Sequence, residues 1–183
     1  MVRIHGSTCE DTPNFGFLTV VEDTNKAMFG GYLILNHLGR PLEFHCTAPI
    51  IPNRAQEILY GPTLRPFLFG EQIGGTLIER AKTVPDLLCV DRSEGLSVRD
   101  FSPAPVALVL DEENGNPADF VRSSNCPIHR IGINRLTFPG EDSNAAVQRL
   151  ARLSAIIEQL DLVEPFTRIR EAIDEARRGG AAA

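Results

Sequence analysis

Apolar and polar residues alternate in the first part of the chain, a pattern typical of β-strands that bury one face. Residues 17–21 predict a first strand and residues 28–36 predict a second. Asn36 and Gly39 then occupy the first and fourth positions of a turn, as in hairpins that join a type I turn to a glycine bulge. With a third strand ending near residue 47, we expect an antiparallel three-strand meander.

The same turn predicts how the second and third strands pair. Pairing residue 36 with residue 40 places alternate residues opposite each other, in the pairs Ile34–Leu42, Tyr32–Phe44 and Gly30–Cys46. This register puts His45 and Cys46 on opposite faces of the sheet, with His45 beside Glu43. We therefore expect the Cys46 thiol on the core face, and we do not expect His45 and Cys46 to ligate one metal ion.

Residues 53–81 predict a helical segment with interruptions. Gly61-Pro62 ends a short first helix, and Pro66 predicts a kink near the start of a longer one. The longer helix contains three glycines, each of which costs about 1 kcal/mol relative to alanine: Gly70, Gly74 and Gly75. We expect these glycines to allow a close approach to the sheet or to another subunit.

The second half of the chain predicts further strands and two helices. The apolar run 85–91 is typical of a strand buried on both faces, and after a long helix it is expected to lie parallel to an earlier strand. Residues 106–110 predict another strand, an acidic turn covers 111–117, and a weaker strand pattern lies around 128–136. Two helical stripes follow, at Val147, Leu150, Ser154 and Ile157 and at Phe166, Ile169, Ile173 and Ala176.

These elements predict one α/β domain with a mixed sheet. It comprises the three-strand meander, a kinked crossover helix, a buried parallel strand, further short strands and two C-terminal helices. The expected divisions are an irregular N-terminal arm over 1–14, the mixed α/β core over 15–140, a C-terminal helical pair over 141–178 and a disordered tail over 179–183.

Composition narrows the classes of function. The chain has 183 residues, 43% of them hydrophobic and 23% charged, with a formal net charge of −6. It has no apolar run long enough to cross a membrane and no signal-peptide pattern, so we expect a cytoplasmic protein. A general nucleic-acid-binding protein usually carries a basic stripe that neutralises phosphates, and none is present, so the sequence argues against nucleic acid as a partner.

Acidic residues form the first candidate site. Asp91 ends the buried strand, Glu57 lies in the first turns of the preceding helix, and Glu22 and Asp23 end the first strand. Carboxylates that converge at strand ends can hold Mg²⁺ or Mn²⁺, which activate water for phosphodiester cleavage. A divalent metal ion bound by Glu57 and Asp91 is the cofactor that this set predicts.

The order of three meandering strands, a helix and a strand resembles the ribonuclease H-like superfamily. Residues 53–57 (NRAQE) resemble the start of that family's helix, and residues 90–93 (VDRS) resemble the end of its fourth strand. The resemblance implies a metal-dependent hydrolase or nuclease with Glu57 and Asp91 as ligands. The family also has an aspartate in the middle of its first strand, where this chain has Thr19, Val20 and Val21.

Nitrogen and sulfur side chains form a second candidate set. Cys126 and His129 have the Cys-x-x-His spacing of a zinc half-site, which His45 or Cys46 could join. The cysteines at 46, 89 and 126 are also candidate nucleophiles, with His45, His129 or Asp91 as partners. Among these thiols, Cys89 is expected to be buried and inert, and Cys126 to be the exposed one.

A role without catalysis is the alternative to these sites. The chain has no Gly-x-Ser-x-Gly elbow, P-loop or dinucleotide fingerprint. The consecutive residues 67–69 (FLF) cannot all face one core, so we expect an apolar patch around 67–74 or on the last two helices that contacts a partner. The favoured interpretation is a ligand-binding or assembly protein, expected to form a homo-oligomer. The alternative is the metal-dependent hydrolase or nuclease that uses Glu57 and Asp91.

Overall fold

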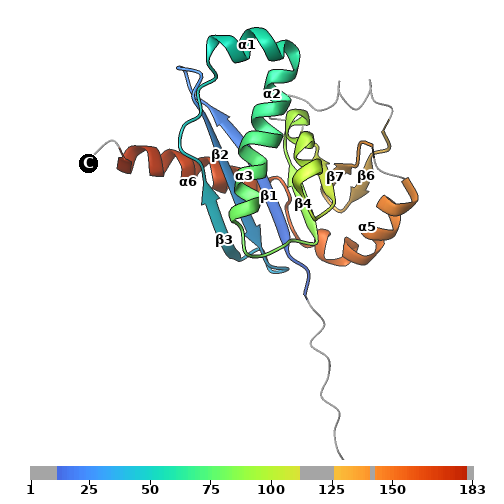
Figure 1. Cartoon of the computed structure of the whole chain (residues 1–183). Helices are drawn as coiled ribbons and strands as arrows, with labels where there is room; N and C mark the ends of the chain where they lie inside the picture. The colour runs from blue at the N-terminus through green and yellow to red at the C-terminus, as the bar shows by residue number, and fades with distance from the viewer. Residues whose placement is uncertain (1–11, 112–125, 141–142, 181–183) are drawn as a thin grey trace, which may run out of the picture.

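The computed structural model describes residues 12–111, 126–140 and 143–180 and contains a mixed, open β-sheet (Figure 1). Within these residues the sheet has seven strands in the order β3-β2-β1-β4-β5-β7-β6. The strands are β1 Phe15–Glu22, β2 Met28–Leu35, β3 Pro41–Cys46, β4 Leu87–Val90, β5 Val106–Val109, β6 His129–Ile131 and β7 Asn134–Thr137. The first three form the predicted antiparallel meander, and β4 pairs in parallel with β1 and β5. The predicted α/β class is confirmed.

The predicted register of β2 with β3 is wrong by one residue. The turn closes as expected, because the Asn36 amide donates to the Arg40 carbonyl at 3.0 Å. The register then shifts at Ile34, which lies opposite Glu43, so that Leu42 is the extra residue of a β-bulge. Beyond the bulge the cross-strand pairs are Leu33–Phe44, Tyr32–His45 and Gly31–Cys46. The bulge exchanges the faces that the following residues of β3 occupy.

The helical segment after β3 consists of short pieces. They are α1 Arg54–Tyr60, η1 Gly61–Thr63, α2 Leu64–Pro66, the π-helical turn η2 Phe67–Gly75 and α3 Thr76–Arg80. A Cβ atom at Gly70 would overlap Ser97 of the 3₁₀ segment η3 Ser93–Phe101, and one at Gly74 would overlap Val98 and approach Leu18. The glycines thus allow a close approach, but mainly to η3, and only Gly74 also comes close to the sheet, at Leu18.

The expected apolar contact patch at residues 67–74 is wrong. Leu68, Phe69 and Ile73 are buried, and the Phe67 ring stacks on Tyr60 with ring centroids 4.3 Å apart. The difference arises because η2 packs against η3 as well as against β1 and β2, so its side chains are covered on more than one side.

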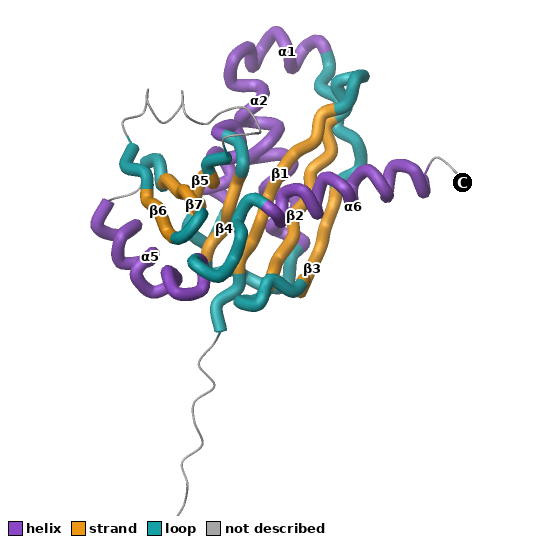
Figure 2. Tube along the Cα trace, turned by 180° about the vertical axis from the view of Figure 1, so that it is seen from behind, coloured by secondary structure: helices purple, strands orange, loops and turns teal. Residues whose placement is uncertain are grey.

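Two helices cover the other face of the sheet, α5 Ser143–Ile157 and α6 Glu164–Gly180 (Figure 2). One hydrophobic core lies between the sheet and these helices, and a second lies between the sheet and η2, α3 and η3. Phe166, Ile169 and Ile173 of α6 are buried as predicted, whereas Ala176 and Val147 are exposed. The buried positions of α5 are Ala146, Leu150, Leu153 and Ile157.

Several predicted features lie outside the described residues. They are most of the N-terminal arm, which includes residues 1–11, the acidic turn after Asp111 and the end of the tail at 181–183. The two residues before 181 belong to α6. No helix in the described part of the chain is long and apolar enough to span a membrane. The cytoplasmic location stays a prediction.

Candidate functional site

Asp91 follows β4 directly, where the parallel strands β4 and β5 end and beside the middle of β1, which continues to Glu22. Its carboxylate oxygen Oδ2 accepts a hydrogen bond from the Thr19 hydroxyl of β1 at 2.8 Å, and also one from the Arg170 guanidinium of α6. The Asp91 side chain is 10% exposed and that of Arg170 is 28% exposed. We call these three residues the Asp91 cluster. It occupies the carboxyl end of parallel strands, where α/β proteins usually bind ligands.

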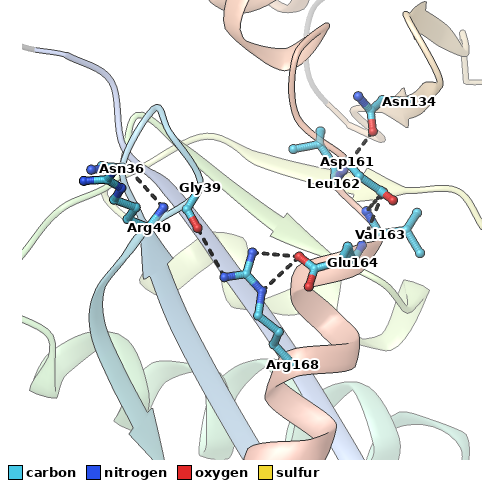
Figure 3. A network of polar contacts seen from close by, with 9 residues as sticks. All are labelled: Asn36, Gly39, Arg40, Asn134, Asp161, Leu162, Val163, Glu164 and Arg168. Atoms are coloured by element: carbon cyan, nitrogen blue, oxygen red, sulfur yellow. Dashed lines mark hydrogen bonds and ion pairs between the residues drawn. The ribbon is translucent and has the colours of Figure 1, made fainter.

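Contacts at the start of α6 fix the position from which Arg170 extends (Figure 3). Arg168 donates to the Glu164 carboxylate at 2.7 Å and to the Gly39 carbonyl of the β2–β3 turn at 3.2 Å. The buried Asn134 side chain of β7 accepts from the Leu162 amide at 2.9 Å. These contacts connect the beginning of α6 to both halves of the sheet. The apolar face of the helix then holds Arg170 beside β4.

A small cavity of about 80 Å³ opens beside the cluster. It is lined by residues at the ends of β4 and β5 and by α6 and the loop before it: Asp91, Arg92, Val109, Asp111, Val163, Phe166 and Arg170. Pockets for drug-sized ligands measure roughly 300–1,000 Å³, and a water molecule takes about 30 Å³ of liquid volume. The cavity therefore suits an ion, a few waters or one phosphate oxygen, and it is too small for an organic ligand.

Burial and the neighbouring donors shift the pKa of Asp91 in opposite directions. Burial raises the pKa of the Asp91 carboxyl, while the Arg170 guanidinium and the Thr19 hydroxyl lower it. Arg92 also favours the ionised form. An ionised Asp91 needs these donors, because an isolated carboxylate is costly to bury.

Glu57, the other predicted ligand, has different partners from Asp91. It lies on α1, where its carboxylate contacts Arg54 at 3.0 Å and Lys26 at 3.8 Å. It does not line the cavity beside Asp91. The structure thus places Glu57 in a surface ion-pair group, and its role as a metal ligand stays a prediction.

The two acidic residues that follow the first strand are also held by arginines. Glu22 contacts Arg65 at 2.8 Å, and the same arginine contacts Glu94 of η3 at 3.4 Å. Asp23 contacts Arg177 of α6 at 3.2 Å. The carboxylates that were expected to gather around an ion are therefore distributed among separate arginine partners.

His45 belongs to a second polar group, which we call the Glu43 cluster. The His45 Nε2 atom lies 3.0 Å from the Glu43 carboxylate, which also accepts from the Thr83 hydroxyl at 2.5 Å and from the Lys82 amide at 3.0 Å. These bonds, led by that of Thr83, lower the pKa of Glu43 to about 2. The cluster joins the edge strand β3 to the loop after α3. His45 thus pairs with a carboxylate, and its role as the partner of a thiol stays a prediction.

The zinc half-site gains no further ligand from the described residues. Among them, no three or more His, Cys, Asp or Glu side chains gather in a way that could hold a metal ion. The His129 ring lies against Phe138, with ring centroids 6.0 Å apart, and Cys126 is half-buried. The zinc site of Cys126 and His129 stays a prediction without a third ligand in the described residues.

Two of the three described thiols, those of Cys46 and Cys126, differ from their predicted exposure. Cys89 is buried as expected, and burial raises the pKa of its thiol. Cys46 is exposed, contrary to the prediction, because the bulge in β3 moves it off the expected face. It lines a groove of about 470 Å³ together with Phe29, Ile173 and Arg177.

The sequence interpretation missed Arg170 and Thr19 as members of the site. A signal for Arg170 exists in the helical periodicity, since it lies four residues after Phe166 and three before Ile173, beside the buried stripe of α6. Thr19 lies at the strand position where the resemblance requires an aspartate. Its hydroxyl is a hydrogen-bond donor to Asp91, so it complements the carboxylate without adding a second negative charge.

Comparison with known proteins gives matches among solved structures only. No family model and no curated protein matches the chain. Human endonuclease V is 13% identical with a TM-score of 0.49, over 94% of this chain and 87% of that chain. Endonuclease V of Ciona intestinalis, in complex with a 23mer DNA containing an inosine followed by a ribo-adenosine, is 9% identical with a TM-score of 0.42, over 73% of each chain. Argonaute of Marinitoga piezophila is 11% identical with a TM-score of 0.36, over 80% of this chain and 26% of that chain.

These similarities correct two predictions. The sequence argued against nucleic acid as a partner, whereas the similar solved structures include an endonuclease in complex with DNA. The sequence also favoured a binding or assembly protein, whereas the similar structures include endonucleases. The prediction against nucleic acid rested on the charge of the whole chain, which does not report the local arrangement of arginines and aspartates at one edge of the sheet.

Proposed function

We propose that this chain is a nuclease that hydrolyses phosphodiester bonds with the help of a divalent metal ion bound beside Asp91. The observation that carries the proposal is the position of Asp91. It is a nearly buried carboxylate at the end of β4 that lines an ion-sized cavity together with a second carboxylate, Asp111. The reaction adds water across a P–O bond and leaves a phosphomonoester and a hydroxyl group.

The residues at the cavity fit a hard divalent cation in kind and in number. Mg²⁺ is commonly held by one or two carboxylates together with substrate phosphates, so Asp91 and Asp111 are sufficient protein ligands. The Thr19 hydroxyl and the Arg170 guanidinium both donate to the same carboxylate oxygen of Asp91, Oδ2. A bound ion would neutralise charge on the phosphate and supply an activated water.

Two arginines at the cavity complement the phosphate group. Arg92 is exposed and follows Asp91 in the chain, and Arg170 reaches the cavity from α6. Arginine binds phosphate oxygens through paired N–H groups, which orients the phosphate as well as attracting it. The remaining residues of the cavity, Val109, Val163 and Phe166, are apolar and limit the access of water.

Cleavage assays with matched aspartate variants test this proposal. The substrates are labelled single-stranded DNA, duplex DNA, RNA and DNA containing inosine, each with Mg²⁺, with Mn²⁺ or with a chelator. We expect metal-dependent cleavage by the wild type and a loss of about a hundredfold or more in Asp91→Asn, since metal-dependent hydrolysis depends on the ligands of the ion. Asp86→Asn is the control, because Asp86 precedes the same strand at its other end and its carboxylate accepts from the Asn14 amide.

Two results would overturn the nuclease proposal. One is the absence of cleavage of every substrate by the folded wild type. The other is an Asp91→Asn variant that cleaves as fast as the wild type and the Asp86→Asn control, because the reaction would then occur elsewhere or come from a contaminant.

A further inference from the structure

Arg170 is bonded to the carboxylate of Asp91, which the proposed function assigns to a metal ion as a ligand. Its guanidinium and the Thr19 hydroxyl both donate to Oδ2 of Asp91, on the cavity side of α6. A divalent cation at Asp91 would place two positive groups next to each other in a poorly hydrated cavity. Like charges in such a setting repel strongly, so Arg170 and the ion compete for Asp91.

The side chain of Arg170 can move while its helix stays in place. Phe166, Ile169 and Ile173 are almost completely buried beneath α6, and Arg168 and Asn134 anchor its beginning. The Arg170 side chain is 28% exposed, which is more than that of Asp91. A long, partly exposed side chain on an immobile helix changes its partner by rotation about its own bonds. The exchange therefore requires no rearrangement of the fold.

Nucleic acid would provide the alternative partner for Arg170. Each phosphate carries a negative charge and acceptor oxygens that a guanidinium binds well. We propose that Arg170 is a positioning residue that pairs with Asp91 in the free protein and moves to a phosphate of bound nucleic acid, so that metal binding at Asp91 depends on nucleic acid. This inference rests on the proposed function and adds an order to it, in which nucleic acid binds first and the metal ion second.

Binding of Mn²⁺, followed through the electron paramagnetic resonance signal of the free ion, tests the exchange without any need for turnover. The nucleic acid is a short single-stranded DNA with phosphorothioate linkages, which resists cleavage. We expect this DNA to tighten Mn²⁺ binding by the wild type about tenfold or more, within the range usual for coupled binding sites. Coupling is reciprocal, so Mn²⁺ must tighten DNA binding by the same factor.

Variants of α6 identify the side chain responsible. Arg170→Gln is expected to bind Mn²⁺ without DNA more tightly than the wild type does without DNA, and to gain less than the wild type when DNA is added. Arg178→Gln removes the same charge eight residues later on α6, at an exposed pair with Glu175, and is expected to behave as the wild type. Asp91→Asn with the DNA measures the ions that the DNA itself binds. Circular dichroism and thermal unfolding establish that each variant is folded, and the wild-type comparison with and without DNA needs no variant.

The outcomes separate this inference from the nuclease proposal. Wild-type protein that binds Mn²⁺ equally well with and without DNA overturns the exchange and leaves the nuclease proposal standing. DNA-dependent binding that is unchanged in a folded Arg170→Gln variant overturns the role of Arg170. Absence of Mn²⁺ binding in every sample, above the level of Asp91→Asn, overturns both proposals.

Discussion

The Asp91 cluster and the Glu43 cluster both surround a carboxylate with several hydrogen-bond donors, yet their settings differ. Asp91 is nearly buried, opens onto an ion-sized cavity and has a charged partner from a distant helix. Glu43 lies on the edge strand, and two of its donors are consecutive residues of one loop. Burial raises the pKa of Asp91, whereas hydrogen bonds lower that of Glu43.

The comparison shows that the number of donors around a carboxylate does not make a functional site. The bonds of Glu43 connect two backbone segments, so its carboxylate is engaged in holding the loop to the strand. The bond between Asp91 and Arg170 joins two side chains beside a cavity, and either side chain can find another partner there. The Asp91 cluster differs from the Glu43 cluster in two ways. The partner of its carboxylate can be exchanged, and a cavity beside the carboxylate can hold the new partner.

The largest expected effect on stability comes from removing the charged partner of Asp91. Arg170→Ala leaves a nearly buried carboxylate with only the Thr19 hydroxyl, and we expect a loss of about 3 kcal/mol, the lower end for broken buried ion pairs. Urea unfolding followed by circular dichroism measures it. Arg178→Ala, which breaks a more exposed pair with Glu175, is expected to cost less than about 1 kcal/mol and serves as the control.

An Arg170→Ala variant as stable as the Arg178→Ala control would contradict this prediction. It would mean that water reaches Asp91 and replaces the guanidinium at little cost. The difference between the two clusters would then not depend on burial.

Hydroxyl donors in the two clusters allow a second, smaller comparison. Thr19→Val removes the donor to the nearly buried Asp91, and we expect a loss of about 1.5 kcal/mol, as for hydrogen bonds to charged groups. Thr83→Val removes the donor to Glu43, which keeps its bonds to the Lys82 amide and His45, so we expect a loss of less than about 1 kcal/mol. Urea unfolding of both variants gives the two values. A larger loss in Thr83→Val would show that burial does not set the strength of these bonds.

The order of the elements was predictable from the sequence because it depends on local patterns. Alternation and a turn with Asn36 and Gly39 predicted the meander, and the apolar run before Asp91 predicted a strand parallel to an earlier one. The register of β3 was not predictable from the turn alone. The bulge at Leu42 lies beyond the turn and reverses the faces of every later residue of the strand, Cys46 among them.

The candidate site was predictable only in part, for a related reason. Asp91 stands out in the sequence because it ends a buried strand, but its partner Arg170 lies 79 residues further along the chain. Nothing local to either residue indicates that they meet. Glu57 and Asp91 are both candidate ligands in the sequence, and only the three-dimensional structure shows that Asp91 lies beside a cavity while Glu57, on α1, pairs with the exposed cations Lys26 and Arg54.

The smallest expected effect on stability comes from replacing Glu57. This variant also tests whether Asp91 binds the metal ion without Glu57. Its partners Lys26 and Arg54 have side chains that are 72% and 82% exposed, so Glu57→Gln is expected to cost less than about 0.5 kcal/mol in urea unfolding. The same variant is expected to bind Mn²⁺ as the wild type does, in contrast to Asp91→Asn. A folded Glu57→Gln variant that loses Mn²⁺ binding would show that Glu57 reaches the ion when nucleic acid is bound. The pair of ligands implied by the resemblance would then be correct, and α1 would have to approach Asp91 during the reaction.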